Sequence, residues 1–135
     1  LFLYTGGTTG MPKGVMWSHE IWRRAGMEGA ESQGLPVPSN MDEQVMAAQA
    51  LGRHVRNIPA CPLMHGTGLF TAMGSMLGGG TIVTLTENKR FNPQNLFETV
   101  EREGVTNMAI VGDAFGKPML AYLDVTGQAL PQAPQ

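Results

Sequence analysis

Apolar and polar positions along the chain follow two periods, one typical of buried strands and one typical of amphipathic helices. Short apolar or β-branched runs that stop at breaker residues predict buried strands at residues 1–5, 57–61, 81–85 and 105–111. Longer segments with apolar residues on one face predict helices that begin after Ser18 and cover residues 42–51, 68–77, 92–104 and 114–123. Strands that alternate with helices in this way predict an α/β fold with a mainly parallel sheet flanked by helices.

Residues at the predicted helix ends support these boundaries. Ser18 is a favourable N-cap for the first helix, Asn92 precedes a proline that suits a first helical turn, and Gly104 suits a helix end. Asp113 is predicted to cap the last helix rather than to bind a metal. Residues 34–40 are rich in Gly and Pro, which predicts a surface connection.

The length of 135 residues suits one domain with a core, which we expect at residues 1–124. Residues 125–135 are polar and Pro-rich without periodicity, so they are expected to form a disordered or non-native tail. The chain does not begin with Met and starts inside a predicted strand. Its true N-terminus is therefore expected to be missing.

Composition narrows the classes of partner. A formal net charge of −2 predicts no general polyanion-binding surface, and hence no nucleic-acid partner. The chain has no apolar run of about 18 residues and no basic leader, so neither a membrane span nor a secretory signal is predicted. The single cysteine, Cys61, suits a reducing, cytoplasmic compartment, and we interpret it as a small buried hydrophobe rather than a nucleophile.

The strongest chemical signal is the segment TGGTTGMPKG at residues 5–14. Its glycines leave backbone amides open to an anion, its threonines add hydroxyl donors, and its lysine adds a mobile positive charge. These residues are, in order, Gly6, Gly7, Gly10 and Gly14, then Thr5, Thr8 and Thr9, and finally Lys13. The combination predicts a loop that holds the phosphates of ATP, with an ordinary Gly/Thr-rich turn as the weaker interpretation.

A Walker loop of a P-loop nucleotidase is a second alternative. Its pattern places glycine directly before lysine and a hydroxyl residue directly after it. Here Met11 and Pro12 separate Gly10 from Lys13, and Gly14 stands where the magnesium-binding hydroxyl belongs. An apolar run that leads to Asp113 offers only a weak match to the second Walker motif. The Walker interpretation is therefore the lesser one.

The order TGGTTGMPKG closely resembles the phosphate signature of the adenylate-forming superfamily, which includes acyl-CoA synthetases, luciferases and nonribosomal-peptide adenylation domains. Further segments resemble that family in the same order: VMWSHE after the loop, then residues 62–68 (PLMHGTG), 76–83, 91–93 and 103–106. The resemblance covers residues 1–123. GVMWSHE and IVGDAFGKPML look most like actinobacterial long-chain or steroid-side-chain acyl-CoA synthetases.

This resemblance implies part of a large N-terminal domain that uses ATP with Mg²⁺ to convert a carboxylic acid into an acyl-adenylate, and coenzyme A to form a thioester. It implies that the β- and γ-phosphates are held by Thr5, Gly6, Gly7, Thr8, Thr9, Gly10 and Lys13. It also implies that His65, in an acyl-pocket motif at residues 62–68, lies beside the reacting carboxylate and helps to gate it. Gly66, Thr67 and Gly68 are the expected substrate-binding neighbours, and Phe70 and Thr71 are further pocket candidates.

The other candidate residues are interpreted as structural. His19 and His54 are expected to be structural. The methionines, among them Met64, Met73, Met76 and Met119, could line a pliable acyl pocket, although each by itself is better interpreted as core packing. The later adenine, ribose and lid segments of the family are not found, so the chain is interpreted as a fragment that is inactive alone. The alternative is a non-catalytic remnant that binds a phosphate ligand.

Overall fold

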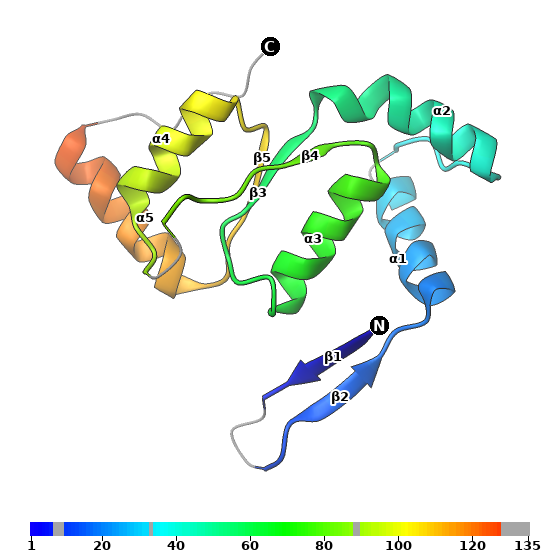
Figure 1. The fold of residues 1–135 in the computed structure, drawn as a ribbon, viewed down its shortest axis with the longest axis horizontal. Helices are drawn as coiled ribbons and strands as arrows, with labels where there is room; N and C mark the ends of the chain where they lie inside the picture. The colour runs from blue at the N-terminus through cyan, green and yellow to red at the C-terminus, as the bar shows by residue number, and fades with distance from the viewer. Residues whose placement is uncertain (7–9, 33, 88–89, 128–135) are drawn as a thin grey trace. The chain divides into compact units, whose positions relative to one another are not determined.

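The computed structural model describes residues 1–6, 10–32, 34–87 and 90–127 (Figure 1). The chain divides into two compact units, Leu1–Glu43 and Gln44–Gln135. In chain order the elements are β1 (Phe2–Thr5), β2 (Lys13–Met16), α1 (His19–Ser32), α2 (Met41–Leu51), the 3₁₀ helix η1 (Gly52–His54), β3 (Arg56–Pro59), α3 (Gly66–Leu77), β4 (Thr81–Ile82), α4 (Pro93–Glu103), β5 (Asn107–Ala109) and α5 (Asp113–Thr126).

The first unit begins with an antiparallel hairpin. β1 pairs with β2 from Phe2 opposite Met16 to Thr5 opposite Lys13. The strand predicted at residues 1–5 is present, but the prediction that it is buried is wrong, since Phe2 is 64% and Tyr4 69% exposed. The physical reason is that a two-stranded ribbon is too narrow to bury its own faces.

The first two helices of the chain, α1 in the first unit and α2 across the unit boundary, begin at side-chain caps. The Ile21 N–H donates to Ser18 Oγ at 3.0 Å, which confirms the predicted N-cap of α1. At the start of α2, the Glu43 N–H donates to Asn40 Oδ1 at 2.9 Å, and the Glu43 carboxylate accepts from the Ser39 N–H at 2.8 Å. Asn40 is thus the N-cap of α2 and satisfies an amide that the helix leaves open, while the Glu43 carboxylate holds the residue before the cap. The connection at residues 34–40 contains no helix or strand, as predicted.

The second unit contains a parallel sheet of three strands in the order β4-β3-β5. All three strands are shorter than predicted: β3 stops at Pro59, β4 covers only Thr81–Ile82, and β5 covers only Asn107–Ala109. Pro59 has no N–H to donate, and the next amide, that of Ala60, bonds back to Ile58 O at 2.9 Å. The central strand therefore turns away before its neighbours can extend the ladder.

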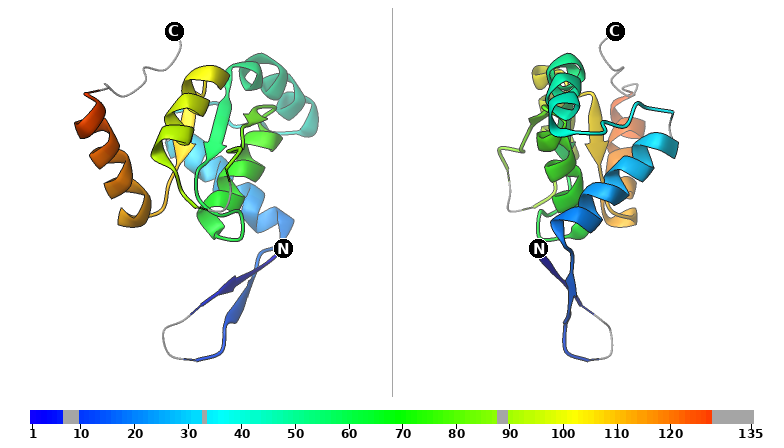
Figure 2. Two further views of the ribbon diagram at one scale, coloured as in Figure 1. Left: turned by 60° about the vertical axis from the view of Figure 1, so that its left-hand side comes forward. Right: turned by 90° about the vertical axis from the view of Figure 1, so that its right-hand side faces the viewer.

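Helices cover both faces of this sheet, with α3 on one side and α4 and α5 on the other (Figures 1 and 2). Successive side chains of β3 show the division, because neighbours in a strand point to opposite faces. Asn57 donates to a carbonyl of α3, whereas Ile58 packs with Leu96 and Val100 of α4 in the apolar core. Met119 of α5 packs against the same core.

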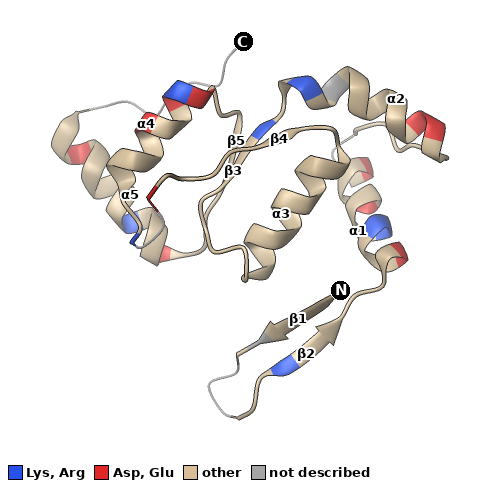
Figure 3. Cartoon of the chain, in the orientation of Figure 1, with Lys and Arg blue, Asp and Glu red and all other residues tan. Residues whose placement is uncertain are grey.

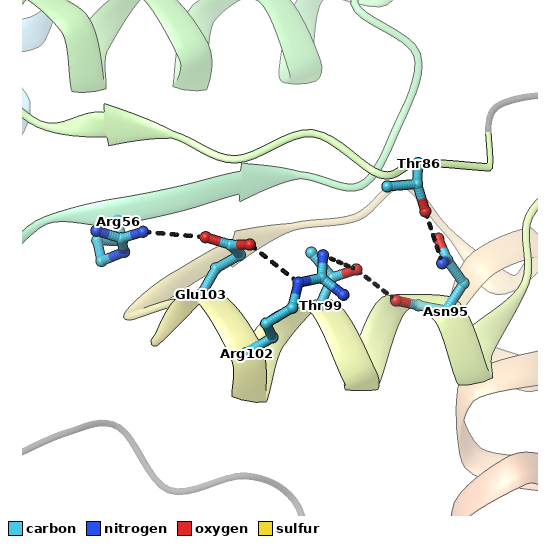
Figure 4. Close-up of polar contacts among 6 residues, drawn as sticks. All are labelled: Arg56, Thr86, Asn95, Thr99, Arg102 and Glu103. Carbon is cyan, nitrogen blue, oxygen red and sulfur yellow. Dashed lines mark hydrogen bonds and ion pairs between the residues drawn. The ribbon is translucent and has the colours of Figure 1, made fainter.

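Helix α4 is closed at both ends as predicted. Asn92 Oδ1 accepts from the amides of the first turn, and Gly104 ends the helix in the left-handed region at φ 58°. A series of polar contacts runs along this helix, from Arg56 through Glu103, Arg102 and the buried Thr99 to Asn95 and Thr86 (Figure 4). These contacts tie α4 to β3 at one end and to the segment after β4 at the other.

Helix α5 differs from its prediction at both ends. The residue before it is Gly112, which makes no side-chain cap, so the prediction that Asp113 is the N-cap is wrong. Asp113 is instead the first helical residue and pairs with Lys117 at 2.9 Å, an i,i+4 contact that also places a negative charge at the positive helix end. The helix continues to Thr126, two residues beyond the predicted domain boundary, and residues 128–135 lie outside the described part. None of the helices within the described ranges is long and apolar enough to cross a membrane.

Candidate functional site

The glycine-rich loop joins the two strands of the hairpin. Gly6 follows β1, and Gly10 has φ 139°, a backbone conformation that favours glycine because L side chains rarely adopt it. Lys13 is the first residue of β2 and lies opposite Thr5, so the two ends of the loop meet across the ribbon. Gly7, Thr8 and Thr9, three of the predicted phosphate-binding residues, lie outside the described residues.

Gly14 permits a close contact at the base of this loop. Tyr4 lies opposite it in the hairpin, and a Cβ at Gly14 would lie 3.3 Å from the Tyr4 ring. The glycine that stands in place of the Walker hydroxyl thus has a packing role. A Walker loop leads from a strand directly into a helix, whereas this loop leads into an antiparallel strand. The Walker alternative is therefore wrong.

The predicted acyl-pocket motif forms the turn from β3 into α3. The His65 N–H donates to Pro62 O at 2.9 Å, and the Leu69 N–H donates to His65 O at 3.0 Å. His65 Nδ1 accepts from the Thr67 N–H at 3.2 Å, so His65 is the N-cap of α3. The helix accordingly begins at Gly66, two residues earlier than predicted, because an imidazole nitrogen replaces the usual capping oxygen.

This cap also defines the chemistry that His65 presents. Since Nδ1 accepts a hydrogen bond, the neutral imidazole carries its proton on Nε2. The side chain is exposed, so its Nε2–H is a donor at the start of α3. Helix amides and the helix dipole at the same place favour a negatively charged group.

Gly68 fixes the position of this helix start. It is buried, and a Cβ at Gly68 would lie 2.6 Å from Pro62 O and 3.0 Å from Cys61 O. The first turn of α3 therefore packs directly on the backbone that precedes His65. This gives Gly68 a packing role, and its predicted contact with substrate stays a prediction.

The other residues predicted near His65 have varied surroundings. Gly66 and Thr67 lie in the first turn of α3, and Thr67 is exposed. The Thr71 hydroxyl donates to Thr67 O at 2.7 Å, within its own helix. Phe70 is half-buried. Their predicted roles in an acyl pocket stay predictions.

The methionines do not share one environment. Met119 packs against the core, in agreement with the prediction of core packing. Met64 is 85% exposed and Met76 65% exposed, so core packing is wrong for these two. Met73 is half-buried on α3.

The remaining candidates belong to other elements than His65 or are chemically quiet. His19 lies in α1 of the first unit, and His54 lies before the amino end of β3, whereas His65 follows its carboxyl end. Cys61 is buried, and burial raises the pKa of its thiol because the thiolate loses hydration. A protonated, buried thiol agrees with the interpretation of Cys61 as a small hydrophobe. Within the described residues, no group of three or more His, Cys, Asp or Glu could hold a metal ion.

The topology of the sheet identifies the edge at which His65 lies. The chain leaves β3 for α3 on one face and leaves β4 for α4 on the other face, although the two strands are neighbours. In open parallel α/β sheets, ligands bind outside the carboxyl ends of strands where connections diverge in this way. The turn at residues 61–65 follows β3 at this edge. Helix α3 carries no charged residue, as its uniform tan colour in Figure 3 shows.

Comparison with known proteins shows the family of the chain. The family model described as "AMP-binding enzyme" matches residues 1–130. The chain belongs to the AMP-binding enzyme family. This AMP-binding chain is 33% identical over 123 residues to the medium-chain acyl-CoA ligase Mig of Mycobacterium avium, with 90% of the chain and 22% of that protein covered.

Two further similarities extend this result. The chain is 35% identical over 123 residues to a medium/long-chain-fatty-acid–CoA/3-oxocholest-4-en-26-oate–CoA ligase of Mycolicibacterium smegmatis, with 90% of the chain and 21% of that protein covered. The fold is similar to o-succinylbenzoate CoA synthetase (MenE) of Bacillus subtilis in complex with the acyl-adenylate OSB-AMP, at a TM-score of 0.66 and 26% identity, with 98% of this chain and 28% of that chain covered. The AMP-binding chain thus spans about a fifth of the length of these two ligases (22% and 21%).

Proposed function

We propose that this chain is part of an AMP-forming acyl-CoA ligase that acts in the cytoplasm on a medium- or long-chain fatty acid or a steroid acid. In this reaction a carboxylate oxygen attacks the α-phosphorus of ATP, and pyrophosphate leaves. The thiol of coenzyme A then attacks the acyl carbon, and AMP leaves. The proposal is supported by family membership over residues 1–130 and by the activities named for the M. avium and M. smegmatis relatives.

The role proposed for the glycine loop is to hold the leaving pyrophosphate. Lys13 supplies a positive charge, and Gly6 and Gly10 expose backbone amides without side-chain obstruction. Gly7, Thr5, Thr8 and Thr9 complete the proposed set. Such preorganised donors stabilise the charge that develops on the leaving group.

The role proposed for His65 is to orient the acid. A carboxylic acid is already ionised at neutral pH, so His65 is not required to act as a general base. Its Nε2–H and the N-terminal turn of α3 offer donors and a favourable dipole to that carboxylate. The charge-free surface of α3 suits an apolar acyl chain alongside. Gly66, Thr67 and Gly68 are proposed to shape this contact.

The proposed cofactors and co-substrate would bind at or beside the same residues. The loop residues are proposed to hold the phosphates of ATP, and coenzyme A is proposed as the second substrate. Mg²⁺ is usually bound by substrate phosphates with one or two carboxylates and waters, so it is proposed to bind together with ATP. It supplies additional charge neutralisation on the phosphates when bound.

The observation that carries the proposal is the presence, within one family match, of both a glycine loop on an antiparallel hairpin and a histidine that caps α3. Calorimetric titration of the chain with ATP–Mg²⁺ tests the loop. We expect heat of binding from the wild-type chain and much weaker binding by Lys13→Ala. Lys117→Ala is the matched control, because Lys117 pairs with Asp113 on α5 and is not proposed to contact ATP.

We expect the isolated chain to show no ATP–pyrophosphate exchange with any fatty acid, because it spans about a fifth of the related ligases. Exchange by the purified chain would overturn that expectation. The second candidate function is a non-catalytic remnant that binds a phosphate ligand. Binding of ATP–Mg²⁺ that depends on Lys13, without function when placed in a complete ligase, would favour this second candidate.

A further inference from the structure

A buried amide ties the central strand to α3. Asn57 is 4% exposed on β3, and its Nδ2 donates to Thr71 O of α3 at 3.3 Å. A buried carboxamide loses its hydration, so it persists in a core only when its hydrogen bonds are satisfied. The next residue, Ile58, faces the apolar core on the other side of the sheet. Asn57 is thus a polar residue whose position serves contact with α3.

Hydrogen bonds continue from this tie to the helix start. The Thr71 hydroxyl donates to Thr67 O at 2.7 Å and lies 3.2 Å from Gly68 O. The Thr67 N–H in turn donates to His65 Nδ1 at 3.2 Å. Asn57, Thr71, Thr67 and His65 are therefore consecutive members of one path from the sheet to the imidazole.

A second contact on the same helix also restricts the position of α3. Gly68 holds the first turn of α3 against Pro62 O, and the Asn57 amide holds the next turn against β3. Residues three apart lie on one face of a helix, so these two contacts together restrict the axial position and the rotation of α3 more than either does alone. The orientation of the His65 ring depends on both.

We infer that Asn57 is a positioning residue for His65: its amide fixes α3 so that the imidazole keeps Nδ1 on the Thr67 amide and Nε2–H toward solvent. This inference rests on the proposed function of His65 for its meaning in the reaction. The geometry that it concerns, however, can be measured in the chain without any substrate.

The test is nitrogen NMR of His65 in the labelled chain, at a pH where imidazoles are neutral. Asn57→Leu keeps a similar side-chain shape and removes the donor. We expect the fraction of His65 with the proton on Nδ1 to rise several-fold. We also expect the Leu69 amide, bonded to His65 O, to exchange with solvent about tenfold faster, as the loss of about one hydrogen bond implies.

Asn95→Leu is the matched control. Asn95 also donates through Nδ2, to Thr86 Oγ1 at 3.0 Å, but it lies on α4 across the sheet. We expect this variant to leave the His65 ring signals unchanged. Equal changes in both variants would show that general loosening of the unit moves His65, and would overturn the inference.

A second pair of variants tests the path if Asn57→Leu does not fold. Thr71→Val removes the hydroxyl that donates to Thr67 O, and Thr71→Ser retains it. Altered His65 signals in the valine variant, restored in the serine variant, support the inference. Unaltered signals in the valine variant contradict it. Failure of ATP–Mg²⁺ to bind would refute the proposed function of the loop and leave these NMR results unaffected.

Discussion

Replacement of Gly68 by alanine tests whether the first turn of α3 really packs on the backbone before His65. The added Cβ would lie 2.6 Å from Pro62 O and 3.0 Å from Cys61 O. Both obstacles are backbone carbonyls rather than flexible side chains. The helix start must therefore move away from the turn, by roughly the shortfall from an ordinary contact of about 3.4 Å.

The magnitude follows from two opposing effects. Overpacking a well-packed site costs about 1–3 kcal/mol, and alanine in place of glycine in a helix returns up to about 1 kcal/mol. Gly68→Ala should therefore lower the free energy of unfolding by about 1–2 kcal/mol. Gly74 lies in the same helix with nothing within 4 Å of an added Cβ, so Gly74→Ala should raise that free energy by about 0.5–1 kcal/mol.

Urea unfolding followed by circular dichroism measures both variants. The two should differ by about 2 kcal/mol, which is a separation of about 1–2 M in the urea midpoint for a chain of this size. Equal midpoints for Gly68→Ala and Gly74→Ala would refute the close packing of α3 on Pro62. A lower midpoint for Gly74→Ala than for wild type would refute the assignment of an open surface to that position.

Three further predictions concern caps and titratable groups. Asn92→Ala, which removes the N-cap of α4, should lower the free energy of unfolding by about 1 kcal/mol in the same urea assay, and an unchanged midpoint would count against the cap. Burial raises the pKa of Cys61, so the folded state holds the thiol proton more tightly than the unfolded state. The free energy of unfolding should therefore fall as pH rises above the ordinary thiol pKa of about 8.5. Cys61→Ala should remove that slope in unfolding curves between pH 8 and 10. Hydrogen bonds from the Ser39 backbone and hydroxyl lower the pKa of Glu43. The contacts of this carboxylate at the start of α2 should therefore be retained above the ordinary carboxyl pKa and lost as pH falls through the lower pKa of the folded state. An acid transition of the helical circular dichroism signal that is identical in Glu43→Gln would contradict this.

Much of the fold could be predicted from local sequence because its helices begin and end at strong signals. Ser18, Asn92 and Gly104 act as predicted, since caps depend on a few neighbouring residues. The ends of the strands were harder to predict, because the hydrogen-bond ladder of a strand ends where its partner strand ends. Pro59 stops the central strand and shortens β4, which no pattern within residues 81–85 could reveal.

The site was only partly visible in the sequence. The glycine loop and His65 were found by their residue types, but the cap made by His65 was missed because histidine is not a usual N-cap. Asn57 was missed as well. The sequence showed only a polar residue inside a predicted buried strand. Its hydrogen bond to α3 depends on the position of that helix, which the sequence pattern does not give.

The most direct test of the central claim places residues 1–127 in the M. avium medium-chain acyl-CoA ligase, in exchange for the segment that they match. ATP–pyrophosphate exchange with a medium-chain fatty acid is then measured for the chimera and its variants. We predict exchange that falls about 100-fold or more in Lys13→Ala, falls in His65→Ala, and is unchanged in Lys117→Ala. Equal exchange in Lys13→Ala and Lys117→Ala would contradict the claim that this glycine loop holds the leaving pyrophosphate.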